Sequence, residues 1–276
     1  MKDYTLLDGY KLPAVGFGTA GLRGIEDMRR IEQALSVGYR LIDTAYGYEN
    51  EGTVGEALRQ SSVPRDQLTL QSKLPGRHHK YDKALRTIEE SIMRLGVDYI
   101  DLYLIHWPNP GEDRYVNAWK ALITAQQTGL VRSIGVCNFL PKHIERLEEE
   151  TGVLPVVNQI ELHPYFQQAE TRAFHQANQI VTQAWSPLGA GQGIMTDDLI
   201  SELAQTHQRS NGQIVLRYLV QLGALPLPRS RHAGRQQDNL NLFDFELTSE
   251  EMERLSHLSK ADGRLFDQDP ETFSDL

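Results

Sequence analysis

The fold is decided by one stretch of mainly apolar residues that ends in a histidine, Tyr99-Ile100-Asp101-Leu102-Tyr103-Leu104-Ile105-His106. A run of this length and composition is typical of a strand that is buried on both faces of a parallel sheet. Two earlier runs likewise end in a polar residue, since residues 40–43 end in Asp43 and residues 68–73 end in Lys73. Neighbouring parallel strands end at the same rim, so we expect these polar side chains to meet there, with Tyr48 in the loop after Asp43.

Strand-like runs alternate with helical patterns along nearly the whole chain. The runs cover residues 15–18, 41–43, 68–73, 99–106, 131–136, 156–159, 180–184 and 224–227. The helical patterns cover residues 27–36, 50–60 and 81–95, a segment that ends near Gly129, a segment that starts near Pro141, residues 167–176, and further stretches up to Leu222. Eight strand-plus-helix units without a Pro-, Gly- or Ser-rich linker predict a single α/β domain over residues 1–276, a (β/α)₈ TIM barrel.

Both ends of the chain carry pieces beyond the eight units. Residues 4–7 and 10–12 flank Asp8-Gly9, a pair that favours a tight hairpin turn. A helix with two glutamates in its first turn is expected from Thr248. We therefore predict an N-terminal β-hairpin that plugs the bottom of the barrel, and extra peripheral helices.

The composition limits the classes of binding partner and the cellular compartment that we expect. The chain has 276 residues and a net charge of -9, which argues against nucleic acid or an anionic membrane as the main partner. Cys137 is the only cysteine, so neither an intrachain disulfide nor a thiolate metal cluster can form. No signal-type or membrane-spanning run is visible in the sequence. We predict a cytoplasmic protein, and nothing in the sequence demands more than a monomer.

One glycine motif supports a different fold. Gly16-Phe17-Gly18-Thr19-Ala20-Gly21 matches the dinucleotide-binding pattern G-x-G-x-x-G and follows a strand, and Asp43 could serve as its ribose-binding acid. A Rossmann-type dehydrogenase is therefore an alternative. In that fold, however, the third glycine lies inside a helix, whereas here the first helical face starts near Asp27. The glycines also suit a tight turn that lets a cofactor or backbone come close.

Asp43, Tyr48, Lys73 and His106 are informative as a group. Each alone could be a cap, a packing residue or a satisfied polar group, but an acid and a base that end adjacent buried strands are expected to pair. A nearby cation lowers the pKa of a phenol from its usual value of about 10. His106 could position a substrate oxygen. The group could thus deliver a proton to a carbonyl oxygen while the carbon receives a hydride.

The chain resembles the aldo-keto reductase family over essentially all of its length. The resembling motifs are Gly16-Phe17-Gly18-Thr19, Asp43-Thr44-Ala45 with Tyr48 and Glu51, Leu104-Ile105-His106-Trp107-Pro108, Gly135-Val136-Cys137-Asn138-Phe139 and Asn158-Gln159-Ile160-Glu161-Leu162-His163-Pro164. The resemblance implies a catalytic tetrad of Asp43, Tyr48, Lys73 and His106, with Tyr48 and not Tyr46 as general acid. It further implies substrate contacts from Tyr48, His106 and Trp107. The hairpin start and the short segment from Asn109 to Arg114 resemble the bacterial members that reduce keto-sugar acids and small dicarbonyls.

An arginine cluster after the last strand points to phosphate. This acidic protein carries three arginines within one segment of seven residues, namely Arg229, Arg231 and Arg235. Barrels often bind phosphate in the loops after their last two strands. A solvated patch that pairs with Asp238 is the plain alternative. The family resemblance implies that the 2′-phosphate and adenine of NADPH are held here, by Arg229, Ser230, Arg235, Asp238 and Asn239.

The resemblance also implies the rest of the cofactor site. Asn138 and Gln159 would hold the nicotinamide carboxamide, and Trp185 would stack on its ring. Ser186, Leu188 and Gly189 would line the pyrophosphate path. The further cofactor contacts would come from Gly18, Thr19, Ala20 and Asp43.

Four positions depart from the family pattern. Arg229 replaces a common lysine, which leaves NADH possible as a weaker alternative to NADPH. Cys137 replaces a serine, and Trp185 replaces a tyrosine that can likewise stack. Ala20 replaces a large aromatic residue, which predicts a wider pocket with Trp107 as the remaining wall.

Two other functions stay open at this point. A cofactor-binding sensor or regulatory subunit could use the same barrel, and a lyase could use Lys73 as a Schiff-base amine if that amine were neutral. The expected partner is a small-molecule carbonyl compound. No metal is implied, because His78 and His79 are adjacent and His163 has no partner acid in sequence.

Overall fold

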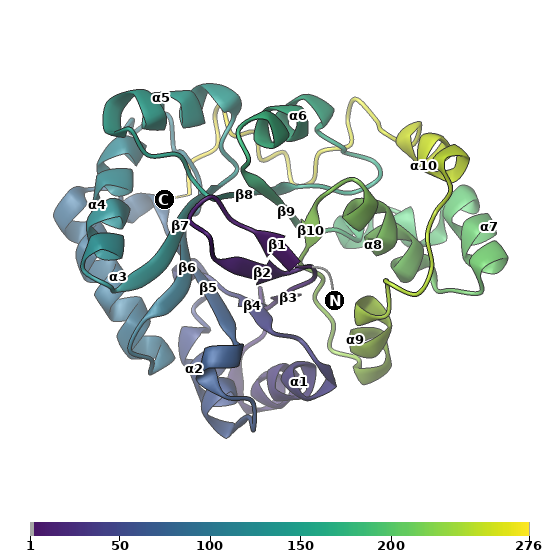
Figure 1. Ribbon diagram of the computed structural model, residues 1–276, viewed down its shortest axis with the longest axis horizontal. Coiled ribbons are helices and arrows are strands. Elements are labelled where there is room, and N and C mark those ends of the chain that lie inside the picture. The colour runs from purple at the N-terminus through teal and green to yellow at the C-terminus, as the bar shows by residue number, and fades with distance from the viewer. Residues whose placement is uncertain (1–2, 276) are drawn as a thin grey trace.

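The computed structural model describes residues 3–275, and its centre is a barrel of eight parallel strands that lie side by side in chain order (Figure 1). The Gly16 amide donates to the carbonyl of Pro226, which ends the last strand, and the Gly18 amide donates to that of Pro228 just beyond it, both at 3.1 Å, and these bonds close the barrel. The strands are β3 (Phe17–Gly18), β4 (Leu41–Asp43), β5 (Thr69–Leu74), β6 (Ile100–Ile105), β7 (Val131–Cys137), β8 (Val157–Glu161), β9 (Val181–Trp185) and β10 (Leu225–Pro226). The predicted (β/α)₈ barrel is confirmed, and the open Rossmann sheet is wrong.

Helices surround the barrel on its outside (Figure 1). They are α1 (Gly24–Val37), α2 (Glu51–Gln60), α3 (Tyr81–Leu95), α4 (Tyr115–Gln127), α5 (Pro141–Thr151), α6 (Ala169–Ala177), α7 (Asp198–His207), α8 (Asn211–Gln221), α9 (Ala233–Leu240) and α10 (Ser249–Ser256). The first begins earlier than expected, because the Asp27 carboxylate accepts the Arg23 amide at 2.9 Å and so holds an additional turn. Short 3₁₀ turns are η1 (Tyr46–Tyr48), η2 (Arg65–Gln67), η3 (Gly76–His78), η4 (Gly189–Gly191) and η5 (Ile194–Thr196).

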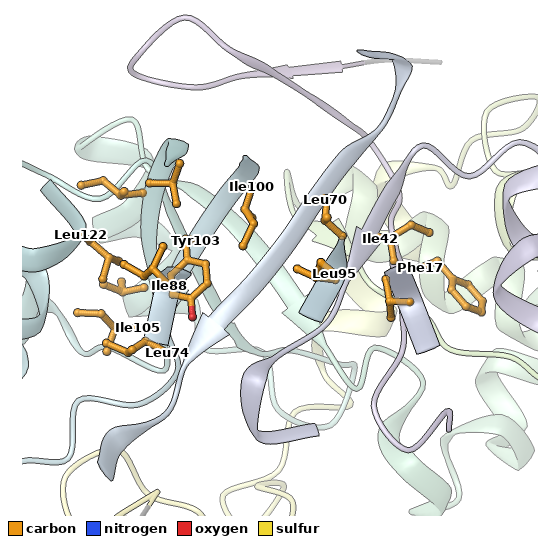
Figure 2. Close-up of a cluster of buried hydrophobic side chains, with 14 of the residues drawn as sticks. Phe17, Ile42, Leu70, Leu74, Ile88, Leu95, Ile100, Tyr103, Ile105 and Leu122 are labelled. Carbon is orange, nitrogen blue, oxygen red and sulfur yellow. The ribbon is translucent and has the colours of Figure 1, made fainter. Parts of the chain in front are cut away.

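Side chains point alternately outward and inward along the strands, and so form two separate hydrophobic cores. Outward side chains pack against the helices in a layer that contains Phe17, Ile42, Leu70, Tyr103 and Ile105 (Figure 2). Inward side chains of the same strands fill the barrel, with Leu41, Leu102 and Leu225 near the bottom. Above them the inward positions carry polar side chains, which places the chemistry at the carboxyl ends of the strands.

The N-terminal hairpin covers the bottom of the barrel, as predicted. Its strands β1 (Asp3–Thr5) and β2 (Lys11–Pro13) pair antiparallel, and Leu6 and Leu12 pack into the lower core. The Leu6 amide donates to the Tyr10 carbonyl at 2.8 Å, so three residues form the loop and Gly9 takes a left-handed φ of 88°.

None of the helices within residues 3–275 combines the length and the apolar character that crossing a membrane requires.

Candidate active site

Four predicted side chains converge at the carboxyl end of the barrel. Asp43 ends β4, Tyr48 ends η1, Lys73 is the penultimate residue of β5, and His106 follows β6. Nζ of Lys73 donates to Oδ1 of Asp43 at 2.6 Å and to the Tyr48 hydroxyl at 3.3 Å. The rings of Tyr48 and His106 meet edge to face, with centroids 5.7 Å apart. An acid, a cation, a phenol and an imidazole therefore form one continuous group.

The Asp43 carboxylate is the hub of a buried amide network. Its Oδ1 also accepts the side-chain amides of Gln71 at 2.6 Å and Gln159 at 3.0 Å. Gln71 and Gln183 exchange hydrogen bonds of 2.9 and 2.8 Å across the barrel. These donors compensate a charge that has lost its water. Sequence reasoning missed Gln71 and Gln183, although Gln71 shares the inward face of its strand with Lys73.

Burial and neighbouring charges shift the pKa values of Tyr48 and Lys73. Burial raises the pKa of the Tyr48 phenol to about 12, and the charge on Lys73 pulls that pKa back only in part. The expectation of a lowered phenol pKa is therefore wrong, because desolvation outweighs the cation. Burial would lower the pKa of Lys73, but Asp43 and Tyr48 raise it above its ordinary value. A charged Lys73 is a poor Schiff-base nucleophile, which disfavours the lyase.

A second polar link holds the loop that carries Tyr48. The Thr44 carbonyl accepts Nζ of Lys73 at 2.9 Å, and the Thr44 hydroxyl donates to Oδ1 of Asn50 at 2.7 Å. The Asn50 amide in turn donates to the Thr19 carbonyl at 2.8 Å. Tyr46 shares this loop but points elsewhere, since its hydroxyl donates to Glu90 at 3.0 Å. Asn50 was not anticipated from the sequence.

A cavity of about 480 Å³ opens above the tetrad. Its walls include nine of the predicted cofactor residues, namely Gly18, Ala20, Asp43, Asn138, Gln159, Trp185, Ser186, Leu188 and Arg229, as well as Tyr48, His106 and Trp107. Six predicted cofactor residues lie outside this lining, namely Thr19, Gly189, Ser230, Arg235, Asp238 and Asn239. Of these, Thr19 is fully buried, and its hydroxyl donates to the Asp43 carbonyl at 2.9 Å.

The inner end of the cavity suits a carboxamide. The Asn138 amide donates to the His106 carbonyl at 3.0 Å, and Oδ1 of Asn138 accepts the Trp185 indole at 2.7 Å. Gln159 lines the cavity, and its Oε1 receives no hydrogen bond from residues 3–275. One amide hydrogen of Asn138 and one oxygen of Gln159 are thus available beside a flat indole, which fits a nicotinamide.

The three arginines after β10 have different surroundings. Arg231 grips the Asp27 carboxylate with two nitrogens, at 3.0 and 3.1 Å, and so ties the loop after β10 to α1. Arg229 lines the cavity and donates to the Ala20 carbonyl. Arg235 is exposed in the first turn of α9. Arg231 is therefore paired within the protein, whereas Arg229 lines the cavity and Arg235 is exposed.

The C-terminal tail forms a wall of the cavity that sequence reasoning did not foresee. Phe266, Gln268, Phe273 and Asp275 all line it, and the ring of Phe273 lies 4.5 Å from that of Trp107. Trp107 is therefore not the only remaining wall beside Ala20. The tail has no helical or strand periodicity, so the sequence carries no signal of where it folds.

The three singled-out histidines have structural partners. His163 contacts Glu161 at 2.9 Å, and both side chains are buried, so the expectation that it lacks an acid is wrong. Nδ1 of His78 shares a 2.8 Å hydrogen bond with the Thr87 hydroxyl, and His79 is buried. Over residues 3–275, the His, Cys, Asp and Glu side chains nowhere form a group of three or more suited to a metal ion.

Comparison with known proteins gives a consistent result. The profile of the aldo/keto reductase family matches residues 14–260. The chain is 47% identical to 2,5-diketo-D-gluconic acid reductase B of Corynebacterium sp. (strain SHS752001) over 99% of this chain and 98% of that protein. It is 43% identical to methylglyoxal reductase DkgA of Yersinia pestis, over 97% of this chain and 96% of the relative.

Solved structures agree. A mutant of Gox0644 in complex with NADPH superposes with a TM-score of 0.94 at 39% identity, covering 99% of this chain and 98% of the other. A Bombyx mori aldo-keto reductase in complex with NADP superposes with a TM-score of 0.88 at 35% identity, covering 94% and 93%. Full-length identity at this level, on the same barrel, leaves one conclusion. The chain belongs to the aldo/keto reductase family.

Proposed function

We propose that this protein is an NADPH-dependent carbonyl reductase that converts aldehydes and ketones to alcohols, with Tyr48 as general acid. The observation that carries the proposal is the chain of contacts from Asp43 through Lys73 to the Tyr48 hydroxyl, beside His106 in an open cavity. Keto-sugar acids and small dicarbonyls are the candidate substrates, because the relatives are named for 2,5-diketo-D-gluconic acid and methylglyoxal.

Each residue of the site would have its own role in the reaction. NADPH, when bound, supplies the hydride that forms the new C–H bond at the carbonyl carbon. Tyr48 donates its proton to the oxygen as negative charge develops there, and its high pKa keeps that proton in place until then. Lys73 stabilises the phenolate that remains, and Asp43 keeps Lys73 charged. His106 donates a hydrogen bond that holds the substrate oxygen near the phenol.

The cofactor would lie along the lined cavity and past it to α9. Asn138, Gln159 and Trp185 would hold the nicotinamide. Ser186, Leu188 and Gly189 would follow the pyrophosphate, and the adenosine phosphate would meet Arg229, Ser230, Arg235, Asp238 and Asn239. Arginine binds phosphate oxygens in a planar fork, so we propose NADPH as the main cofactor and NADH as a weaker one.

The test is Tyr48→Phe, which removes the proton donor and keeps the ring. We expect kcat for aldehyde reduction to fall about a thousandfold, while NADPH still binds, as followed by quenching of the fluorescence of Trp107 and Trp185. Tyr46→Phe is the matched control from the same loop and should keep its kcat. Retained turnover in Tyr48→Phe would remove Tyr48 from its role, and NADPH binding without turnover in the unaltered protein would favour a sensor.

A further inference from the structure

We propose that the carboxylate of Asp275, in the C-terminal tail, makes this site select carbonyl substrates that carry no negative charge. The inference rests on the proposed reductase function and narrows its substrate class. Keto-sugar acids are anionic at neutral pH, whereas small dicarbonyls such as methylglyoxal are neutral. The proposal therefore favours the second class over the first.

Asp275 stands in the reaction cavity. It lines the same cavity as Tyr48 and His106, and its Oδ2 lies 3.0 Å from Nδ1 of His106. The two atoms are not aligned well enough for a full-strength hydrogen bond. The Asp275 side chain is 25% exposed, so water screens its charge only in part. A substrate whose oxygen reaches His106 must therefore pass close to this carboxylate.

The position of Asp275 is set by its backbone. Its amide donates to Oδ1 of Asn109 at 3.0 Å, and its carbonyl accepts the Asn109 amide at 3.4 Å. Gly76 leaves room for this arrangement, because a Cβ there would lie 2.5 Å from the Asp275 carbonyl oxygen. Phe273 packs on Trp107 two residues earlier. These contacts hold the tail whether or not the side chain at position 275 is charged.

Among residues 3–275, two other charged side chains line the cavity, those of Asp43 and Arg229. Asp43 is neutralised by Lys73, and Arg229 donates to the Ala20 carbonyl at the proposed cofactor end. The lining contains no lysine among residues 3–275 and no arginine other than Arg229. Within the described part of the chain, the cavity therefore offers a carboxylated substrate no unpaired cation beside Tyr48.

Asp275 is ionised at neutral pH. Burial works to raise the pKa of its carboxyl group, but His106, the Gly76 amide and Arg77 together hold that pKa below its ordinary value. The field that an incoming anion meets is therefore repulsive. Such repulsion is stronger in a partly desolvated cavity than in bulk water.

The experiment compares 4-nitrobenzaldehyde with 4-carboxybenzaldehyde, which differ in the charge of one substituent. Each is assayed with NADPH on the unaltered protein and on Asp275→Asn. We expect Asp275→Asn to raise kcat/KM for the carboxylated aldehyde about tenfold relative to that for the nitro compound, mainly through a lower KM. Asp275→Glu keeps the charge and should restore the original preference.

Glu271→Gln is the matched control. It removes one negative charge from the same tail, but Glu271 pairs with Lys142 outside the cavity, so the ratio of the two kcat/KM values should not change. Equal changes for both aldehydes in Asp275→Asn would mean a merely structural role and would overturn the inference. If the unaltered protein reduces neither aldehyde, the proposed function itself falls, and the inference falls with it.

Discussion

At the scale of single residues, the site depends on charges that are buried and yet fully partnered. Lys73 is completely buried, and it stays charged because Asp43 lies 2.6 Å away. Asp43 in turn needs the amides of Gln71 and Gln159. A buried pair of this kind is sensitive to the loss of one partner, since the remaining group then lacks both water and a hydrogen bond.

Gln71→Met tests this dependence without a large change in volume. We expect kcat to fall about ten- to a hundredfold, because Asp43 and then Lys73 lose their alignment. We also expect a loss of about 1–3 kcal/mol in the free energy of unfolding, because Gln183 is left with an unpaired buried amide. Steady-state kinetics and urea unfolding measure the two effects.

The double variant Gln71→Met/Gln183→Met separates those effects. Removing both partners should recover much of the stability, since no buried amide is left without a bond, while kcat should stay low. Recovery of kcat in the double variant would show that Gln71 does not position Asp43.

At the scale of elements, α2 packs so closely against the end of α3 that the size of the side chains at the contact is limited. Gly55 faces the Leu95 carbonyl so closely that a Cβ would lie 2.2 Å from its oxygen. Gly52, one turn earlier in the same helix, would meet only the Arg94 carbonyl oxygen at 3.9 Å. Two glycines in one helix therefore have different reasons to be present.

Gly55→Ala and Gly52→Ala form a matched pair. The first should destabilise the protein by about 1–3 kcal/mol, because the added methyl forces the two helices apart. The second should be neutral or stabilising by up to about 1 kcal/mol, because alanine is the better helix former. Urea unfolding of both variants decides the matter, and equal stabilities would contradict the packing argument.

At the scale of the whole molecule, burial suppresses the protonation of several histidines. Burial lowers the pKa of His78, His79, His143 and His175 to about 4 in each case. In the unfolded chain the same groups titrate near about 6.5. Between these values the unfolded state binds more protons than the folded state, so acid favours unfolding.

Stability should therefore be greatest above about pH 6.5 and should fall as the pH drops towards about 4, by up to about 1.4 kcal/mol per pH unit for each histidine. Urea midpoints across this range measure the trend. His175 accepts or donates at both nitrogens, to Asn158 and Thr182, each at 2.9 Å. His175→Gln should lower the stability at neutral pH and flatten its pH dependence, and an unchanged slope would exclude His175 as a contributor.

The sequence by itself determined the eight units, the hairpin and the convergence of Asp43, Lys73 and His106, because strand periodicity and strand ends are local properties of the chain. Only the tertiary structure decided the Gln71–Gln183 contact, which joins residues 112 positions apart, and the place of Asp275 beside His106. Barrel closure brings opposite strands together, and an aperiodic tail folds according to what it meets. Likewise, the direction of the Tyr48 pKa shift depends on burial, which no local pattern encodes.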